Sequence, residues 1–218
     1  MSSFATSRRV ADMLFAIQIT GAILSCSSQI VRSLADVHGI SIAVFGLSVL
    51  HCGFHIWLGI AAHRACPTRL TVQAMITYGT WGVLTLMVVG AILVNGHYRW
   101  SVQDTSIVIV VCVLTTILVQ ICYWKEKTIL DPAMKGLLAM TYKFTPNIFL
   151  AWKIFVEGGS GIPGLAIFIG HLTISIRVGQ VYLMVREAGW DRNRVWLAIS
   201  ETSNEISWVV VTAVWLLS

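Results

Sequence analysis

Four side chains that could bind a polar solute fall on one face of the last long apolar stretch, residues 194–217. They are Glu201, Asn204, Glu205 and Trp208, spaced at i, i+3, i+4 and i+7. Two carboxylates, an amide and an indole on one helical face predict a wall of a binding site. For Glu201 an alternative stays open, because it could instead pair with Arg194 or a neighbouring arginine.

Arg177 lies midway through another apolar stretch, residues 162–185. An ionised side chain in a membrane span costs roughly 2.5 to 3.5 kcal/mol on insertion scales, so it usually faces a cavity or a partner. We therefore expect Glu205 or Glu201 to be its counter-ion. Such a pair could hold two helices together, contact the solute, or do both.

A polar interruption lies within the apolar residues 134–156. Lys143 and Asn147 are four residues apart and share a helical face. Pro146 lacks a backbone N–H, so it frees a carbonyl one turn earlier and bends a helix. We interpret these three residues as a hinge or gate, and an ordinary kink is the alternative.

His51 and His55 are also four residues apart, within residues 39–62. This spacing can bind a metal, and His171 could approach the pair from another stretch to complete a three-histidine cluster. No further ligand lies nearby, so we predict no metal and no cofactor. The histidines are instead expected to line a cavity or to donate hydrogen bonds between helices.

Tyr78 and Trp81 lie near the middle of residues 69–95. Together they could supply a flat stacking surface opposite Trp208. Aromatic side chains in apolar helices also serve simply in packing, and this alternative stays open.

The composition places these side chains in a membrane. Of 218 residues, 56% are hydrophobic and 11% are charged, with a mean hydropathy of +0.78, whereas soluble domains carry about 25% charged residues. We predict an all-α integral membrane protein with seven transmembrane helices, each needing about 20 apolar residues. Their expected ranges are 10–31, 39–62, 69–95, 104–124, 134–156, 162–185 and 194–217.

The positive charge of the chain, formally +5, is concentrated in the expected loops on one side. With the N-terminus placed inside, ten Lys and Arg residues fall on the inner side and about three on the outer side. We therefore predict a multi-pass protein of the cell membrane with a cytoplasmic N-terminus and an external C-terminus. Because the loop bias explains the charge, no nucleic-acid partner is expected.

Residues 1–100 and 131–218 have the pattern of two copies of one three-helix unit. The register aligns Gly39 with Gly161, His51 with Thr173 and His55 with Arg177. Residues 101–130 hold one further apolar helix, which we interpret as a linker. A single extra span makes the two units parallel rather than inverted, and a solute site is then expected between them.

The segments around Gln29 and Asn147 resemble the PQ-loop signature of the PQ-loop/SWEET transporter superfamily. That signature places proline-glutamine near the end of the first helix of each bundle, followed by a short loop and a glycine-rich restart. Here the first copy has Ser28 before Gln29, and the second has Pro146 before Asn147. The resemblance implies two parallel three-helix bundles joined by a linker helix, with Gln29 and Asn147 shaping the gates.

Members of this superfamily carry sugars, vitamins or amino acids, usually by facilitated diffusion. We therefore expect a uniporter that moves a small polar solute, a sugar or similar, across the lipid bilayer. A PnuC-like carrier of a vitamin or nucleoside and a ligand-binding receptor of the same fold remain alternatives, and a homo-oligomer is compatible with each. No nucleophile elbow, H-E-x-x-H motif or phosphate loop is present, so no enzymatic activity is predicted.

Overall fold

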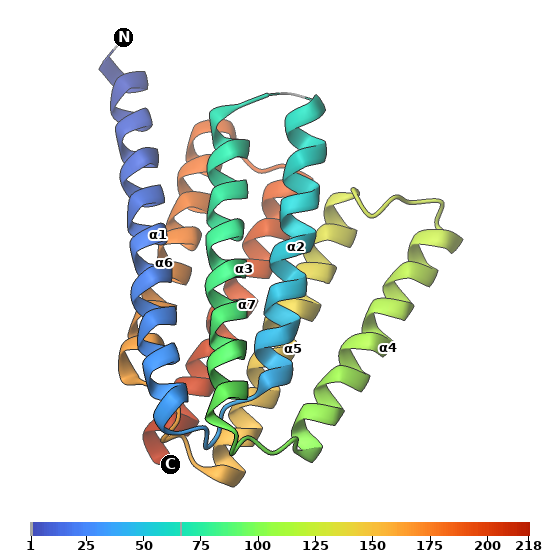
Figure 1. The fold of residues 1–218 in the computed structure, drawn as a ribbon. Helices are drawn as coiled ribbons and strands as arrows, with labels where there is room; N and C mark the ends of the chain where they lie inside the picture. Colours follow the sequence, from blue (N-terminus) through green and yellow to red (C-terminus); the bar gives the residue numbers. More distant parts are fainter. Residues whose placement is uncertain (1, 66) are drawn as a thin grey trace.

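The computed structural model describes residues 2–65 and 67–218, with the side chains of these residues except 2–8, 65, 70, 187 and 188. The described chain folds into seven α-helices (Figure 1). They are α1 (Ser2–Ala35), α2 (Ile42–Ala65), α3 (Arg69–Asn95), α4 (Val102–Trp124), α5 (Pro132–Glu157), α6 (Gly164–Ala188) and α7 (Arg192–Leu217). The all-α prediction is confirmed, and each expected helix is present.

Local polar residues set several helix ends. Thr68 and Ser101 begin α3 and α4 with capping boxes, in which the cap hydroxyl accepts from the N–H three residues later. Asp131 caps α5, and Pro132 takes the first helical position, where no N–H is needed. Gly96 ends α3 with a φ of 74°, a left-handed conformation that glycine adopts without strain.

Five of the described helices, α1 to α4 and α6, are long and apolar enough to cross a membrane. The other two, α5 and α7, carry charged side chains along their middle turns, including Lys143 and Glu201. These charges pair inside the protein, as shown below. With the apolar composition, the helices indicate a membrane-embedded helical protein.

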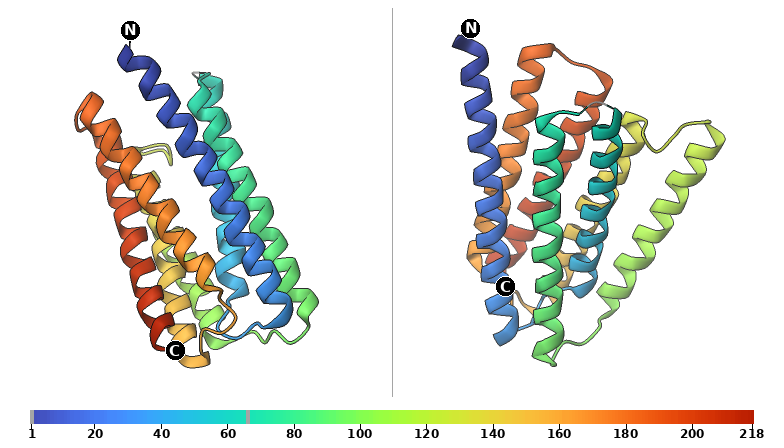
Figure 2. Two further views of the ribbon diagram at one scale, coloured as in Figure 1. Left: turned by 90° about the vertical axis from the view of Figure 1, so that its left-hand side faces the viewer. Right: turned by 45° about the horizontal axis from the view of Figure 1, so that its top comes forward.

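The helices pack as two sets, which we call the first set (α1–α3) and the second set (α5–α7). In the first set α3 contacts both α1 and α2, and in the second set α7 contacts both α5 and α6. The sets meet where α1 contacts α6 and α2 contacts α5 (Figures 1 and 2). Helix α4 contacts α5 and α2, and its C-terminal end stands away from the other helices (Figure 1).

A buried ion pair joins α4 to α5. Lys153 Nζ lies 2.6 Å from Oδ2 of Asp104, and the two side chains are 1% and 0% exposed. The hydroxyls of Ser41 and Ser101 also donate hydrogen bonds to the Asp104 carboxylate, at 2.5 and 2.7 Å. A buried pair is stable only when its remaining hydrogen-bonding groups are satisfied in this way. The apolar helix that we interpreted as a linker is thus joined to α5 by an ion pair and to the residue before α2 by a hydrogen bond.

The loops that follow α1 and α5 are hydrogen-bonded to each other at one end of the bundle, which we call the loop end. The N–H of Gly161 donates to the carbonyl of His38 at 3.0 Å. The Gln29 amide donates to the carbonyl of Gly161, also at 3.0 Å. Gly39 has a φ of 71°, and a Cβ there would lie 1.9 Å from the carbonyl oxygen of Gly158. Glycine is therefore required at residue 39.

Charged side chains reinforce this loop junction. Arg32 Nε donates to the carbonyl of Ser160 at 2.6 Å, and the Ser160 hydroxyl donates to Asp36 Oδ2 at 2.6 Å. Burial raises the pKa of Asp36, but hydrogen bonds from Ser160 and His38 outweigh it and lower that pKa to about 2. The ionised carboxylate is the form that holds the junction.

This pKa predicts how the junction depends on pH. A carboxylate with a lowered folded-state pKa stabilises the protein above its unfolded pKa of about 3.9, and that contribution disappears as pH falls toward the folded pKa. In thermal unfolding from pH 7 to 2, wild type should unfold at higher temperature than Asp36→Asn above about pH 4. The difference should vanish near pH 2. A constant difference across this range would contradict the assignment.

Candidate functional site

A cavity of about 240 Å³ lies between the two helix sets. Every helix except α4 contributes to its wall. Ten of the residues singled out from the sequence line it: Gln29, His51, Tyr78, Trp81, Lys143, Pro146, Asn147, Arg177, Asn204 and Trp208. The structure thus brings together most of the candidate site, although a role for each residue in binding a solute stays a prediction.

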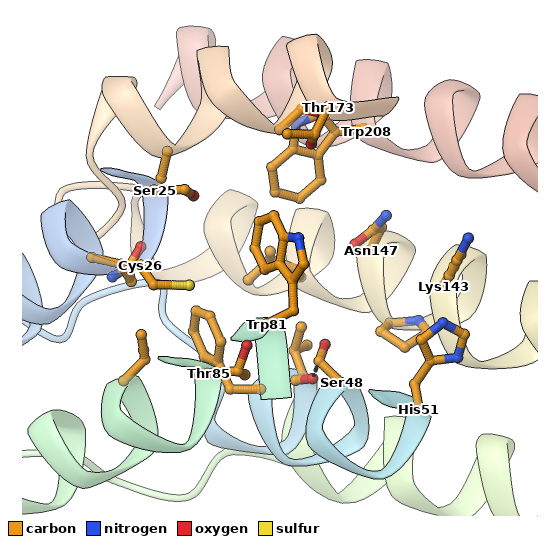
Figure 3. Close-up of a pocket in the computed structure, with 18 of the residues that line it drawn as sticks. Ser25, Cys26, Ser48, His51, Trp81, Thr85, Lys143, Asn147, Thr173 and Trp208 are labelled. Atoms are coloured by element: carbon orange, nitrogen blue, oxygen red, sulfur yellow. Dashed lines mark hydrogen bonds between the residues drawn. The ribbon is translucent and has the colours of Figure 1, made fainter. Parts of the chain in front are cut away.

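The cavity has two ends: the charged end, near His51 and Lys143, and the loop end. Figure 3 shows Trp81 at its middle, with His51 and Lys143 on one side and Ser25 and Cys26 on the other. Ile40 and Ile162, from the two hydrogen-bonded loops, also line the wall. The loop junction therefore forms part of the cavity wall at one end.

Lys143 and Glu201 form an ion pair beside the charged end. Lys143 Nζ lies 2.5 Å from Oε1 of Glu201, and the side chains are 9% and 6% exposed. The sequence left open an arginine as the partner of Glu201, and the packing of α5 against α7 brings Lys143 to it. Glu201 itself is not part of the cavity wall.

Arg177 lines the cavity with no carboxylate in salt-bridge range among the described side chains. Its guanidinium carbon lies 5.6 Å from the centre of the Tyr78 ring, a cation–π contact. Tyr78 stacks in turn on His55, with ring centres 4.3 Å apart. Among the described side chains, Arg177 does not form the expected ion pair with Glu205 or Glu201. Glu201 pairs with Lys143 and Glu205 with His171.

Glu205 and His171 pair with each other away from the cavity wall. His171 Nδ1 lies 2.6 Å from Glu205 Oε1, and His171 Nε2 lies 2.8 Å from the hydroxyl of Thr212. His171 therefore does not join His51 and His55, whose ring centres are 4.3 Å apart. Within the described residues no group of three His, Cys, Asp or Glu side chains could hold a metal ion.

The amide side chains of Gln29 and Asn147 lie in the cavity wall and hydrogen-bond to neighbouring elements. Asn147 Nδ2 donates to Asn204 Oδ1 at 3.2 Å and to the Ser207 hydroxyl at 2.9 Å. Gln29 donates both to Gly161 and to the Ser33 hydroxyl. Gln29 and Asn147 thus both lie in the cavity wall, and each is hydrogen-bonded to another helix or loop.

Small polar residues complete the wall and were not anticipated. They are Ser25, Ser48, Thr85 and Thr173. Small hydroxyl residues in apolar helices also serve in helix packing, so composition gives no signal for their role. For Thr173 the alignment of the two repeats is such a signal, because Thr173 aligns with His51 and both residues line the cavity.

Comparison of the chain with protein-family models, with curated proteins and with solved structures gives no match. The chemistry of the site is therefore argued from its own residues.

Proposed function

We propose that this protein is a membrane transporter that moves a small polar solute by facilitated diffusion through the cavity between α1–α3 and α5–α7. The observation that carries the proposal is the cavity itself. Its wall comes from both helix sets and combines imidazole, indole, amide, ammonium and guanidinium groups. Its volume of about 240 Å³ is just below the range of roughly 300–1,000 Å³ typical of small-molecule sites, which favours a small solute.

The helix contacts support an interpretation of the two sets as parallel repeats joined by α4. In both sets the third helix packs against the first and the second. The aligned residues Gly39 and Gly161 lie in loops that hydrogen-bond to each other at the interface between the sets. Parallel repeats that face each other around a central site are a common transporter plan, and the PQ-loop/SWEET superfamily remains our proposed assignment.

The loop junction suggests how access would alternate. We propose that it closes the loop end of the cavity through the hydrogen bonds of Gly161 and Gln29. Transport requires this end to open while the opposite end closes, by movement of one repeat against the other. Pro146, on the cavity wall within α5, gives one place where the second repeat could bend. We further propose seven spans, with the N-terminus in the cytoplasm and the loop end outside.

Filling the cavity tests the proposal. Ser48 lines the cavity, and among the described residues its hydroxyl bonds only to the carbonyl of Val44 on its own helix, at 2.9 Å. We expect Ser48→Trp to lower solute flux at least tenfold. Flux would be measured by osmotic swelling of proteoliposomes in a hexose, a neutral amino acid and a small carboxylate. Thr116→Trp is the matched control, because Thr116 on α4 makes the same type of bond to Cys112 at 2.8 Å and is exposed.

Two results would overturn the transporter assignment. One is equal flux through wild type and Ser48→Trp, which would place the pathway elsewhere. The other is saturable solute binding with no flux, which would favour the receptor alternative. Flux that disappears without a proton gradient would instead exclude the uniport mechanism.

A further inference from the structure

We infer that the cavity binds a small organic monoanion through the guanidinium of Arg177. This inference names the class of solute and rests on the proposed transport function. The argument starts from the charges at the charged end. Lys143, Arg177 and Glu201 are two cations and one carboxylate, and the carboxylate is taken by Lys143 at 2.5 Å. One positive charge is left over at the cavity wall.

Among the described side chains, every other carboxylate of a helix already lies in an ion pair, and none lies in salt-bridge range of Arg177. The pairs are Asp12 with Arg69, Asp104 and Glu157 with Lys153, and Glu205 with His171. The guanidinium of Arg177 therefore contacts the face of the Tyr78 ring. This cation–π contact gives none of its five N–H groups an ordinary hydrogen-bond acceptor. A partly buried guanidinium inside a membrane protein is costly without a counter-ion. A bound anion would supply it.

A second polar group at the cavity wall lacks a partner independently of Arg177. The His51 side chain is 8% exposed, and its Nε2 has no hydrogen-bond partner among the described residues. The indole N–H of Trp81, in the middle of the cavity, is also without one. The guanidinium and the indole can only donate, and the imidazole can donate from Nε2 in one tautomer. The solute must therefore offer acceptor atoms.

The charge count and the geometry select among anions. A single surplus positive charge matches one negative charge rather than the nearly two of a phosphate monoester at neutral pH. The planar guanidinium matches a carboxylate, which it can bind through two parallel hydrogen bonds. Much of the remaining wall is apolar or aromatic and includes Val44, Trp81 and Trp208. The solute is thus a small monocarboxylate whose remaining body is apolar or aromatic.

Benzoate and benzamide are the matched probes for this inference, because they share shape and differ in charge. Binding would be measured on the purified full-length protein in detergent by isothermal titration. We expect benzoate to bind wild type at least tenfold more tightly than benzamide. Arg177→Gln should remove this preference, and Arg177→Lys should retain part of it. Arg186→Gln, an exposed position on the same helix, is the control that should leave the preference unchanged.

The inference is overturned if benzoate fails to bind, if both probes bind wild type equally, or if Arg177→Gln keeps the preference. The ratio of benzoate affinity to benzamide affinity in wild type tests the inference even if Arg177→Gln does not fold. Failure of the transport proposal looks different: benzoate then binds preferentially in detergent but does not cross proteoliposomes. Flux of neutral solutes with no preference for benzoate would instead support transport and refute the anion site.

Discussion

Lys153→Met is expected to lower the free energy of unfolding by about 3–5 kcal/mol, the cost of removing one member of a buried ion pair. The methionine keeps the length of the side chain, but the Asp104 carboxylate loses the ammonium 2.6 Å away while it remains completely buried. For a chain of this size the unfolding temperature should fall by about 6–20 °C, measured by thermal unfolding in detergent.

A second variant separates lost charge from lost packing. Lys153→Met with Asp104→Asn removes both charges. An amide oxygen in the place of Oδ2 can still accept from the N–H and hydroxyl of Ser101, and the amide NH2 in the place of Oδ1 can donate to the Ser41 hydroxyl. We expect this double variant to recover at least half of the lost stability, as a coupled pair requires. Lys127→Met is the matched control, because its partner Asp131 lies 3.6 Å away at the surface, where such a pair contributes about 0–1 kcal/mol. Equal losses in Lys153→Met and Lys127→Met would contradict the account.

Gly39→Ala should open the loop end of the cavity. The new Cβ would lie 1.9 Å from the carbonyl oxygen of Gly158, and alanine is strained at a φ of 71°. The two loops must therefore separate, which breaks the bond from Gly161 to His38. Cys26 reports the change, because it lines the cavity and is 5% exposed. We expect its reaction with a hydrophilic maleimide to accelerate at least tenfold.

The measurement uses a background in which alanine replaces the other four cysteines, residues 52, 66, 112 and 122. Gly46→Ala is the matched control, because a Cβ at this position on α2 meets nothing within 4 Å. This control should leave the labelling rate of Cys26 unchanged. If Gly39→Ala also leaves it unchanged while the protein remains folded, the loop junction does not close the cavity.

The candidate site was predictable from the sequence to the extent that it depends on helical periodicity. Asn204 and Trp208 were expected on one face of α7, and Lys143 and Asn147 on one face of α5, and all four line the cavity. The same reasoning placed Glu205 on the solute face. The structure pairs it with His171 off the cavity wall, since a face about 100° wide can turn partly toward a neighbouring helix.

The pairing of charges could not be predicted in the same way. Arg177 was expected to take Glu201 or Glu205, yet Glu201 pairs with Lys143, which is 58 residues distant in sequence. Asp104, near the start of the helix interpreted as an apolar linker, pairs with Lys153. Each of these choices depends on which helices are neighbours and on their rotation about their own axes.

The sequence by itself determined the all-α class, the seven helices with their approximate ends, and the membrane character. These follow from hydropathy, capping residues and turn residues, which act over a few consecutive positions. Only the tertiary structure decided the partners of the buried charges, the junction of the two glycine loops and the lack of a carboxylate beside Arg177 among the described side chains. The reason is physical: in an apolar environment a charge is stabilised by the group it touches, and contacts across helices are fixed by packing rather than by sequence spacing.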